Sequence, residues 1–300
     1  MATARTNGIS VEYDERGEGE PVLFVMGLGG QLIDWHDDFI GLFVDRGFRA
    51  IRFDNRDVGL STKFDWTPPS TTRQVMSVVR RRPLGGVGYR LADMADDAAG
   101  LLDALHIEAA HVVGASMGGM IAQELAIGHP GRVLSLCSIM SNTGDRRRGN
   151  ISPRLLPHIR RLLGSTAPSV DEAVEASVEQ FGIIAGPTFD PDRHRRLASR
   201  SVQRNFDPRG VERQSAAILG SPDRTAALEH VLVPTLVIHG LVDPLVAPSG
   251  GVATCRAIPG SRLLMIPEMG HDLPPARWDE IAAAIVANAR RASRRTASIT

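Results

Sequence analysis

The chain reads Val112-Val113-Gly114-Ala115-Ser116-Met117-Gly118-Gly119 directly after a short apolar run. These residues contain a G-x-S-x-G motif, whose two glycines remove side chains that would collide in a sharp strand-to-helix turn. Such a turn holds the serine in a strained backbone conformation with its hydroxyl projecting from the bend. The flanking residues predict a strand ending at Val113 and a helix over 117–127. We therefore interpret Ser116 as a nucleophile, the alternative being a glycine-rich helix start that only packs closely against a strand.

Short apolar runs alternate with helical segments on both sides of this motif. Apolar runs predict strands at 9–13, 22–26, 49–53, 110–113, 134–140, 235–239 and 262–266. Helical spacing of apolar residues predicts helices at 35–46, 90–105, 117–127 and 275–289, and irregular structure is expected over 54–89. Nearly all-apolar strands that alternate with helices are typical of a mainly parallel sheet covered on both faces. The chain is therefore predicted to have an α/β fold.

The stretch 141–231 has a different character. Strand-like runs vanish, arginines cluster, and proline and glycine separate short helical segments such as 170–181 and 211–219. A chain of 300 residues with 43% hydrophobic content can bury one large core and still carry an inserted subdomain. We expect a core made of 1–140 and 232–300, with a helical cap inserted at 141–231.

Composition excludes several function classes. Lys+Arg and Asp+Glu are both 34, so the basic excess expected of a nucleic-acid-binding protein is missing. Cys137 and Cys255 are too few for a disulfide framework and lack the spacing of a metal site, so we expect no metal and no organic cofactor. The N-terminus is polar and no apolar stretch approaches membrane-spanning length, so we expect a cytoplasmic protein without a transmembrane segment. The oligomeric state stays open, a homo-oligomer included.

A serine hydroxyl needs a general base, normally a histidine oriented by a carboxylate. Among nine histidines, His271 stands in a turn immediately after the strand predicted at 262–266. Loops at the carboxyl ends of parallel strands are where such sheets place active sites. His239 is the strongest rival, but it lies inside an apolar strand, where we expect it to pack or to form a hydrogen bond. His271 is therefore the predicted base.

The predicted carboxylate is Asp243, in the turn that follows the strand at 235–239. It lies on the same edge of the sheet as Ser116 and His271, in the chain order Ser, Asp, His. Asp243 precedes a proline and can serve as turn residue and triad acid at once. Asp272 ranks lower because the side chain of a sequence neighbour of His271 points elsewhere.

Acyl transfer also needs backbone N–H groups that hold a developing oxyanion. Met117 follows the nucleophile at a helix N-terminus and is one predicted donor. The other is Leu28, in the glycine-rich sequence Met26-Gly27-Leu28-Gly29-Gly30 after the second predicted strand. Met26 and Trp35 are predicted to line the substrate pocket, although core packing explains a methionine there equally well.

These motifs together give the chain a family resemblance over most of its length. They are Met26-Gly27-Leu28-Gly29-Gly30, Phe53-Asp54-Asn55-Arg56-Asp57-Val58-Gly59-Leu60-Ser61, Gly114-Ala115-Ser116-Met117-Gly118, His239-Gly240-x-x-Asp243 and Gly270-His271. The chain resembles the α/β-hydrolases, in particular small bacterial serine esterases of the aclacinomycin methylesterase group. That resemblance implies an eight-stranded sheet, a cap over the site and the roles given above for Ser116, Asp243, His271, Leu28 and Met117. The chain departs from the family pattern at Met26, where a loop-bracing histidine is common, and at Asp57, where many relatives carry glycine.

The predicted function is hydrolysis of an apolar small-molecule ester or thioester through an acyl-enzyme on Ser116. Cleavage of a carbon–carbon bond, or perhydrolysis, is the alternative on the same triad. A ligand-binding receptor that keeps the fold with little turnover is the alternative from another class. Contact with lipid through the arginine-rich cap is a further one, although interspersed acidic residues favour an ordinary solvated face.

Overall fold

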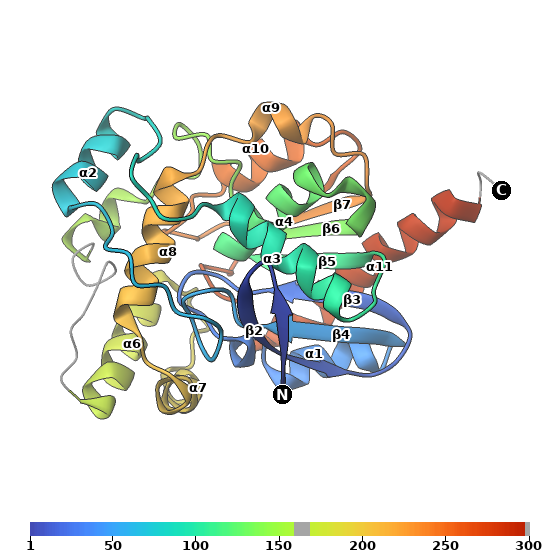
Figure 1. Ribbon diagram of the computed structural model, residues 1–300, viewed down its shortest axis with the longest axis horizontal. Helices are drawn as coiled ribbons and strands as arrows, with labels where there is room; N and C mark the ends of the chain where they lie inside the picture. Colours follow the sequence, from blue (N-terminus) through green and yellow to red (C-terminus); the bar gives the residue numbers. More distant parts are fainter. Residues whose placement is uncertain (159–168, 298–300) are drawn as a thin grey trace.

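The computed structural model describes residues 1–158 and 169–297. Its centre is an eight-stranded sheet with the strand order β1-β2-β4-β3-β5-β6-β7-β8 (Figure 1). The first two pairings, β1 with β2 and β2 with β4, are antiparallel, and the remaining pairings are parallel. The strands span Ala2–Thr6, Ile9–Arg16, Glu20–Val25, Phe48–Phe53, Ala110–Ala115, Val133–Ile139, Thr235–Gly240 and Arg262–Ile266, from β1 to β8.

Helices cover both faces of the sheet because the central strands are apolar on both sides. On one face, α3 (Leu91–Ala104) and α4 (Met117–Gly128) pack on the sheet through buried leucines, isoleucines and alanines. On the other, α1 (Asp37–Val44) and α11 (Trp278–Ala297) enclose an aromatic core. The prediction of a mainly parallel sheet with helices on both faces is therefore confirmed.

Three elements outside residues 141–231, a strand and two α-helices, are absent from the sequence prediction. The first is β1, which pairs with β2 although its residues Ala-Thr-Ala-Arg-Thr form no apolar run. The second is α2 (Thr71–Val79), which interrupts the stretch expected to be irregular. A further short helix, α10 (Ser249–Ala257), connects β7 to β8. None of these elements buries a broad apolar face, and this explains why periodicity did not predict them.

Between β6 and β7 the described chain forms only helices, and residues 141–231 are called the cap segment below. Its helices are η3 (Pro153–His158), α6 (Val170–Ile184), α7 (Pro191–Arg204), α8 (Pro208–Gly220) and α9 (Thr225–Leu228). Aspartates at the N-caps of α7 and α8, each followed by proline, set the starts of these two helices. Figure 1 shows α6, α7 and α8 together at one end of the molecule.

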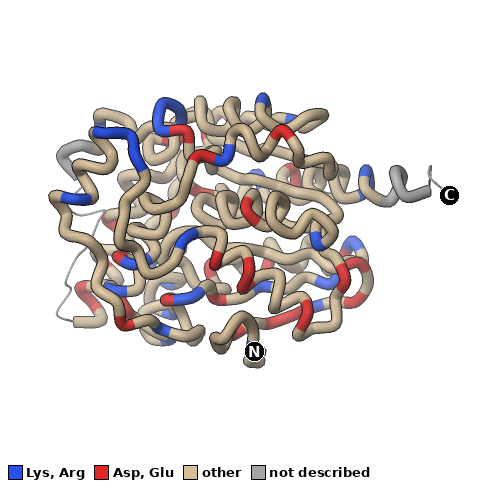
Figure 2. Tube along the Cα trace, turned by 45° about the horizontal axis from the view of Figure 1, so that its top comes forward, with Lys and Arg blue, Asp and Glu red and all other residues tan. Residues whose placement is uncertain are grey.

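Charges of both signs are interspersed along the chain, as expected for a formal net charge of zero (Figure 2). No helix in the described part of the chain combines the length and the apolar character needed to cross a bilayer.

Candidate active site

The turn at Ser116 has the strained geometry that its glycines predict. Ser116 has φ +54° and ψ −118° between the end of β5 and the start of α4. A Cβ on Gly114 would lie 2.1 Å from the carbonyl oxygen of Gly118, and one on Gly118 would lie 2.0 Å from that of Val25. Side chains at either position would thus collide with backbone. A non-glycine residue in this region costs about 1–3 kcal/mol, which the surrounding packing must offset.

The three residues predicted to act together lie within hydrogen-bonding distance. His271 Nε2 is 2.9 Å from Ser116 Oγ, and His271 Nδ1 is 2.8 Å from Asp243 Oδ2. His271 and Asp243 are both buried. With Nδ1–H donated to the carboxylate, Nε2 is the nitrogen that accepts the serine proton. The arrangement can therefore deprotonate the Ser116 hydroxyl as it attacks.

Asp243 is held by its own turn. Its Oδ1 accepts hydrogen bonds from the backbone N–H groups of Leu245 and Val246, each at 2.9 Å. The second oxygen, Oδ2, is left for the imidazole. One side chain thus serves both as turn residue and as the partner of His271.

His239 and Asp272, the alternatives to His271 and Asp243, both have structural roles. His239 is fully buried and donates from Nε2 to the carbonyl oxygen of Val246 at 2.8 Å; burial lowers its pKa, which favours the neutral ring. Asp272 Oδ1 accepts from the N–H groups of Gly270 and Gly186, each at 3.0 Å. Asp272 therefore holds the histidine loop rather than the imidazole, and burial raises its pKa.

The glycine-rich loop after β3 lies against the nucleophile. A Cβ on Gly27 would be 3.2 Å from Ser116 Cβ and 3.8 Å from Ser116 Oγ. Leu28 is half-exposed beside it, and its N–H forms no hydrogen bond with another described residue. Met117 begins α4, where the first backbone N–H groups have no intrahelical acceptor. Of the two predicted oxyanion donors, Met117 therefore follows Ser116 in the sequence, and Leu28 lies in the loop beside it.

Hydrogen bonds from other elements brace this loop. Asn55 Nδ2 donates to the carbonyl oxygen of Met26 at 2.9 Å. The N–H of Gly29 donates to Gln214 Oε1 at 2.9 Å, and Gln214 Nε2 donates to the carbonyl oxygen of Arg56 at 2.7 Å. Gln214 belongs to α8 of the cap segment and is fully buried. Sequence reasoning missed it, because a glutamine in a polar helix carries no motif.

Asp57 has a backbone conformation that suits glycine. Its φ is +70°, a conformation that glycine adopts without strain. The buried Asp57 carboxylate accepts hydrogen bonds from Arg213 Nε at 2.9 Å and from the Tyr89 hydroxyl at 2.6 Å. Burial, with Asp57 nearby, raises the pKa of Tyr89. The aspartate thus ties the core to α8 at a strained position.

The structure places the two predicted pocket residues differently. Trp35 is 1% exposed and packs in the aromatic core, with its ring 5.2 Å from Phe24 and 5.9 Å from Phe39 between centroids. This placement corrects the expectation for Trp35, because its bulky ring is taken up by packing. Met26 is only half-buried, and its side chain lies over Gly30 beside the loop.

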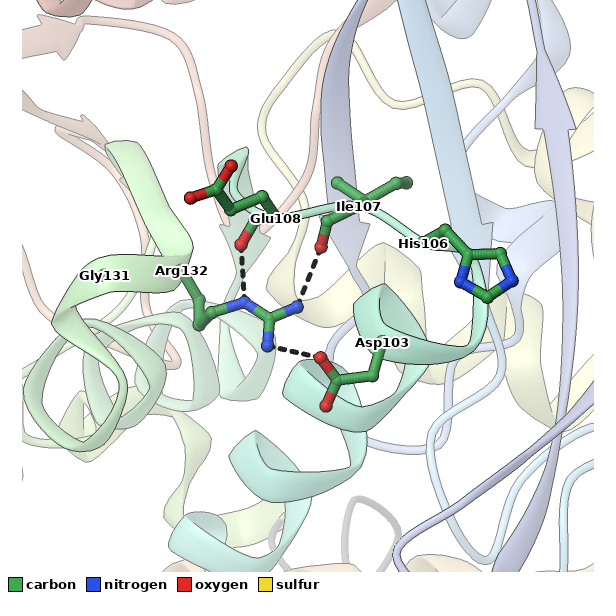
Figure 3. A pocket seen from close by; sticks show the side chains of 6 residues that line it. All are labelled: Asp103, His106, Ile107, Glu108, Gly131 and Arg132. Atoms are coloured by element: carbon green, nitrogen blue, oxygen red, sulfur yellow. Dashed lines mark hydrogen bonds and ion pairs between the residues drawn. The ribbon is translucent and has the colours of Figure 1, made fainter.

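An open hollow at the far end of β5 has no part in this site (Figure 3). Its lining residues come before β5 or before β6 in the sequence; they are Asp103, His106, Ile107, Glu108, Gly131 and Arg132. Ser116, by contrast, lies after the opposite end of β5. The Arg132 guanidinium is already bound to Asp103 and to the carbonyl oxygens of Ile107 and Glu108. Within the described ranges, no group of three or more His, Cys, Asp or Glu side chains is arranged to hold a metal ion.

Comparison with known proteins agrees with the observed fold. Residues 20–274 match the family described as the alpha/beta hydrolase fold. Rhodomycin D methylesterase DnrP of Streptomyces peucetius is 30% identical over 91% of this chain and 92% of its own. The 2-hydroxy-6-oxo-6-phenylhexa-2,4-dienoate hydrolase of Comamonas testosteroni is 28% identical, over 90% of this chain and 86% of its own. The structure of a thermophilic esterase from Thermogutta terrifontis superimposes with a TM-score of 0.69 at 24% identity, covering 97% of this chain and 98% of that one. The chain belongs to the α/β-hydrolase family.

Proposed function

We propose that the protein hydrolyses a carboxylic ester through an acyl-enzyme on Ser116. The observation that carries the proposal is the continuous hydrogen-bonded series from Ser116 Oγ through the His271 ring to Asp243. Each member is fixed by local structure: the serine by its turn, the histidine by its loop and the aspartate by two backbone N–H groups.

The first half-reaction follows from this geometry. Ser116 Oγ attacks the acyl carbon while His271 Nε2 takes the hydroxyl proton. The N–H groups of Leu28 and Met117 stabilise the oxyanion of the tetrahedral intermediate. The bond to the leaving alcohol then breaks, and the alcohol oxygen takes the proton from the imidazolium.

The second half-reaction returns the enzyme to its starting state. Water attacks the acyl carbon of the ester on Ser116 while His271 Nε2 takes a proton from it. The bond between the acyl carbon and Oγ breaks, and the imidazolium returns the proton to the serine. The products are the carboxylic acid and the free alcohol, and no cofactor enters the balance.

An apolar small-molecule ester is the proposed substrate class. The half-exposed Leu28 and the half-buried Met26 border the loop beside the nucleophile, and both are apolar. The cap segment lies over the same loop through Gln214, and its Ile184 carbonyl accepts the backbone N–H of His271 at 2.8 Å. A relative at 30% identity is named as a methylesterase, which favours an ester over a thioester.

A second candidate is cleavage of a carbon–carbon bond, favoured by the relative named as a dienoate hydrolase. The same residues would serve: Ser116 attacks the ketone carbonyl carbon, the bond from that carbon to its neighbouring carbon breaks, and the leaving carbon takes the proton from the His271 imidazolium. Turnover of p-nitrophenyl esters without turnover of a 2-hydroxy-6-oxo-dienoate supports ester hydrolysis as the function. The opposite pattern supports the second candidate.

The decisive experiment compares the wild type with Ser116→Ala. The wild type should react with a fluorophosphonate probe and turn over p-nitrophenyl esters, and the variant should lose about 10⁶ in kcat. Ser77→Ala, which removes another buried serine, is the control that should keep both activities. Labelling without turnover would favour a ligand-binding receptor, and unchanged turnover by Ser116→Ala would refute the assignment.

A further inference from the structure

The helix α2 is oriented opposite to an ordinary amphipathic surface helix. Its buried side chain is Ser77, at 8% exposure, and Gln74 beside it is half-buried. Its apolar residues face outward: Val75, Met76, Val78 and Val79 are 55%, 41%, 52% and 71% exposed. A surface helix normally turns its apolar stripe to the core, so this apolar side is available to another partner.

The polar side chains of α2 form hydrogen bonds within their own segment. Gln74 Nε2 donates to the carbonyl oxygen of Pro69, and Ser77 Oγ donates to that of Gln74. The chain after the helix is anchored to α8, because the N–H of Leu84 donates to the carbonyl oxygen of Leu219 at 2.8 Å. Figure 1 shows α2 at the outer end of the molecule, beyond α8 and away from the sheet. The outward apolar side is therefore built into the fold.

The charged residues in the sequence around this helix all have one sign. Residues 66–92 contain no aspartate or glutamate and carry five arginines: Arg73, Arg80, Arg81, Arg82 and Arg90. Arg73, Arg80, Arg81 and Arg82 are exposed and form no ion pair with a described residue. Some arginines of the cap segment are paired instead, such as Arg195 with Glu175 and Asp192. The neutrality of the whole chain thus conceals a local basic and apolar patch.

We propose that α2 docks the protein onto an anionic lipid surface. Valine and methionine side chains enter the boundary between head groups and acyl chains, and the arginines bind lipid phosphates. This combination of an apolar helix side with a basic border is what an interfacial helix requires. A second copy of the chain fits less well, because two α2 surfaces in contact would bring four exposed arginines against four others.

The test is co-sedimentation of the full chain with vesicles. Binding is expected to vesicles of equal parts phosphatidylcholine and phosphatidylglycerol, weak binding to phosphatidylcholine alone, and release as salt is raised. The triple variant Arg80→Gln, Arg81→Gln, Arg82→Gln should lose about a hundredfold in partition coefficient, from about fivefold per arginine. The double variant Val75→Asp, Val79→Asp should lose binding with all its arginines intact.

A matched control changes the same number of charges on another surface. Arg196→Gln, Arg200→Gln, Arg209→Gln removes three exposed arginines of α7 and α8 and should bind vesicles as the wild type does. Equal loss in this control would overturn the proposal in favour of unspecific charge attraction. Absence of wild-type binding to the anionic vesicles would also overturn it. So would a dimer, by sedimentation equilibrium, that Val75→Asp, Val79→Asp dissociates while vesicle binding persists.

Discussion

The backbone N–H of Gly29 donates a hydrogen bond to the side chain of Gln214, 185 positions away in the sequence. Gly29 follows Leu28 in the loop beside the nucleophile, and Gln214 lies in the middle of α8. The amide of Gln214 is oriented from its other end by the carbonyl oxygen of Arg56. A helix of the cap segment thus fixes the backbone direction of a loop in the sheet core.

Replacing Gln214 with methionine should slow catalysis more than it weakens binding. Methionine keeps the volume and removes both hydrogen bonds, so the loop loses its fixed direction. We expect kcat to fall by about tenfold or more and KM to change little. This loss is smaller than the roughly 10²–10³ lost in kcat when an oxyanion donor is removed completely. Steady-state kinetics on a p-nitrophenyl ester measure both constants.

Two variants separate this positioning role from a general loss of stability. Gln214→Glu keeps an acceptor for the Gly29 N–H and should recover part of the lost kcat. Gln123→Met removes the hydrogen bonds of another fully buried glutamine, with a similar cost of about 1–3 kcal/mol in unfolding free energy. If Gln123→Met lowers kcat as much as Gln214→Met does, the positioning role is wrong.

Replacing Asp243 with asparagine should reduce kcat by about 10⁴. The asparagine amide can donate to His271 Nδ1, which favours the ring tautomer that cannot accept the Ser116 proton. Asp272→Asn is the comparison, because Asp272 bonds two backbone N–H groups rather than the ring. A pair of equal losses would contradict the assignment of Asp243 as the orienting carboxylate.

The stability of the helix pair α6 and α7 should decrease in acid because of His194. Its ring stacks on Phe181 at 4.3 Å, and burial lowers its pKa from 6.5 to about 4. Between these two pH values the unfolded chain binds a proton at His194 that the folded chain does not bind, so unfolding free energy falls as pH falls. Thermal unfolding from pH 7 to pH 4 should show this decrease.

His194→Gln should make the melting temperature less dependent on pH. Between pH 7 and pH 4 its melting temperature should fall by a few degrees less than that of the wild type. His230→Gln, at an exposed histidine, is the control and should follow the wild-type curve. A parallel decrease in His194→Gln would show that other groups cause the acid sensitivity.

Removing the carboxylate of Asp57 should destabilise the protein although it relieves backbone strain. Asp57→Gly suits the positive φ but leaves Arg213 buried without its main partner, at a cost of about 3–5 kcal/mol. The double variant Asp57→Gly, Arg213→Met should recover most of that loss. Urea denaturation of both variants measures the difference, and additive losses would contradict the coupling.

The sequence predicted those parts of the site that follow from local pattern. Ser116 lies in a motif that needs two glycines for steric reasons, and Asp243 and His271 follow apolar strands at one sheet edge. Parallel strands bring such residues together whatever the length of chain between them. The sheet and its helical layers were predictable for the same reason.

The features that the sequence did not predict depend on tertiary contacts. Trp35 has the composition expected of a pocket wall, and only the packing of Phe24 and Phe39 around it shows that it belongs to the core. The strand β1 gains its stability from pairing with β2, so its own residues give no signal. Gln214 acquires a role only because α8 folds back over the loop.

The Ile184 carbonyl that accepts the N–H of His271 has a consequence for protein engineering. Chimeras are usually joined where a graft leaves the sheet, at the ends of β6 and β7 in this chain. A graft whose backbone departs from its present course at residue 184 would leave the N–H of His271 without its acceptor, even with every catalytic side chain retained. Exchange of residues 141–231 between relatives therefore requires that the loop carrying His271 be transferred together with the helices it bonds to.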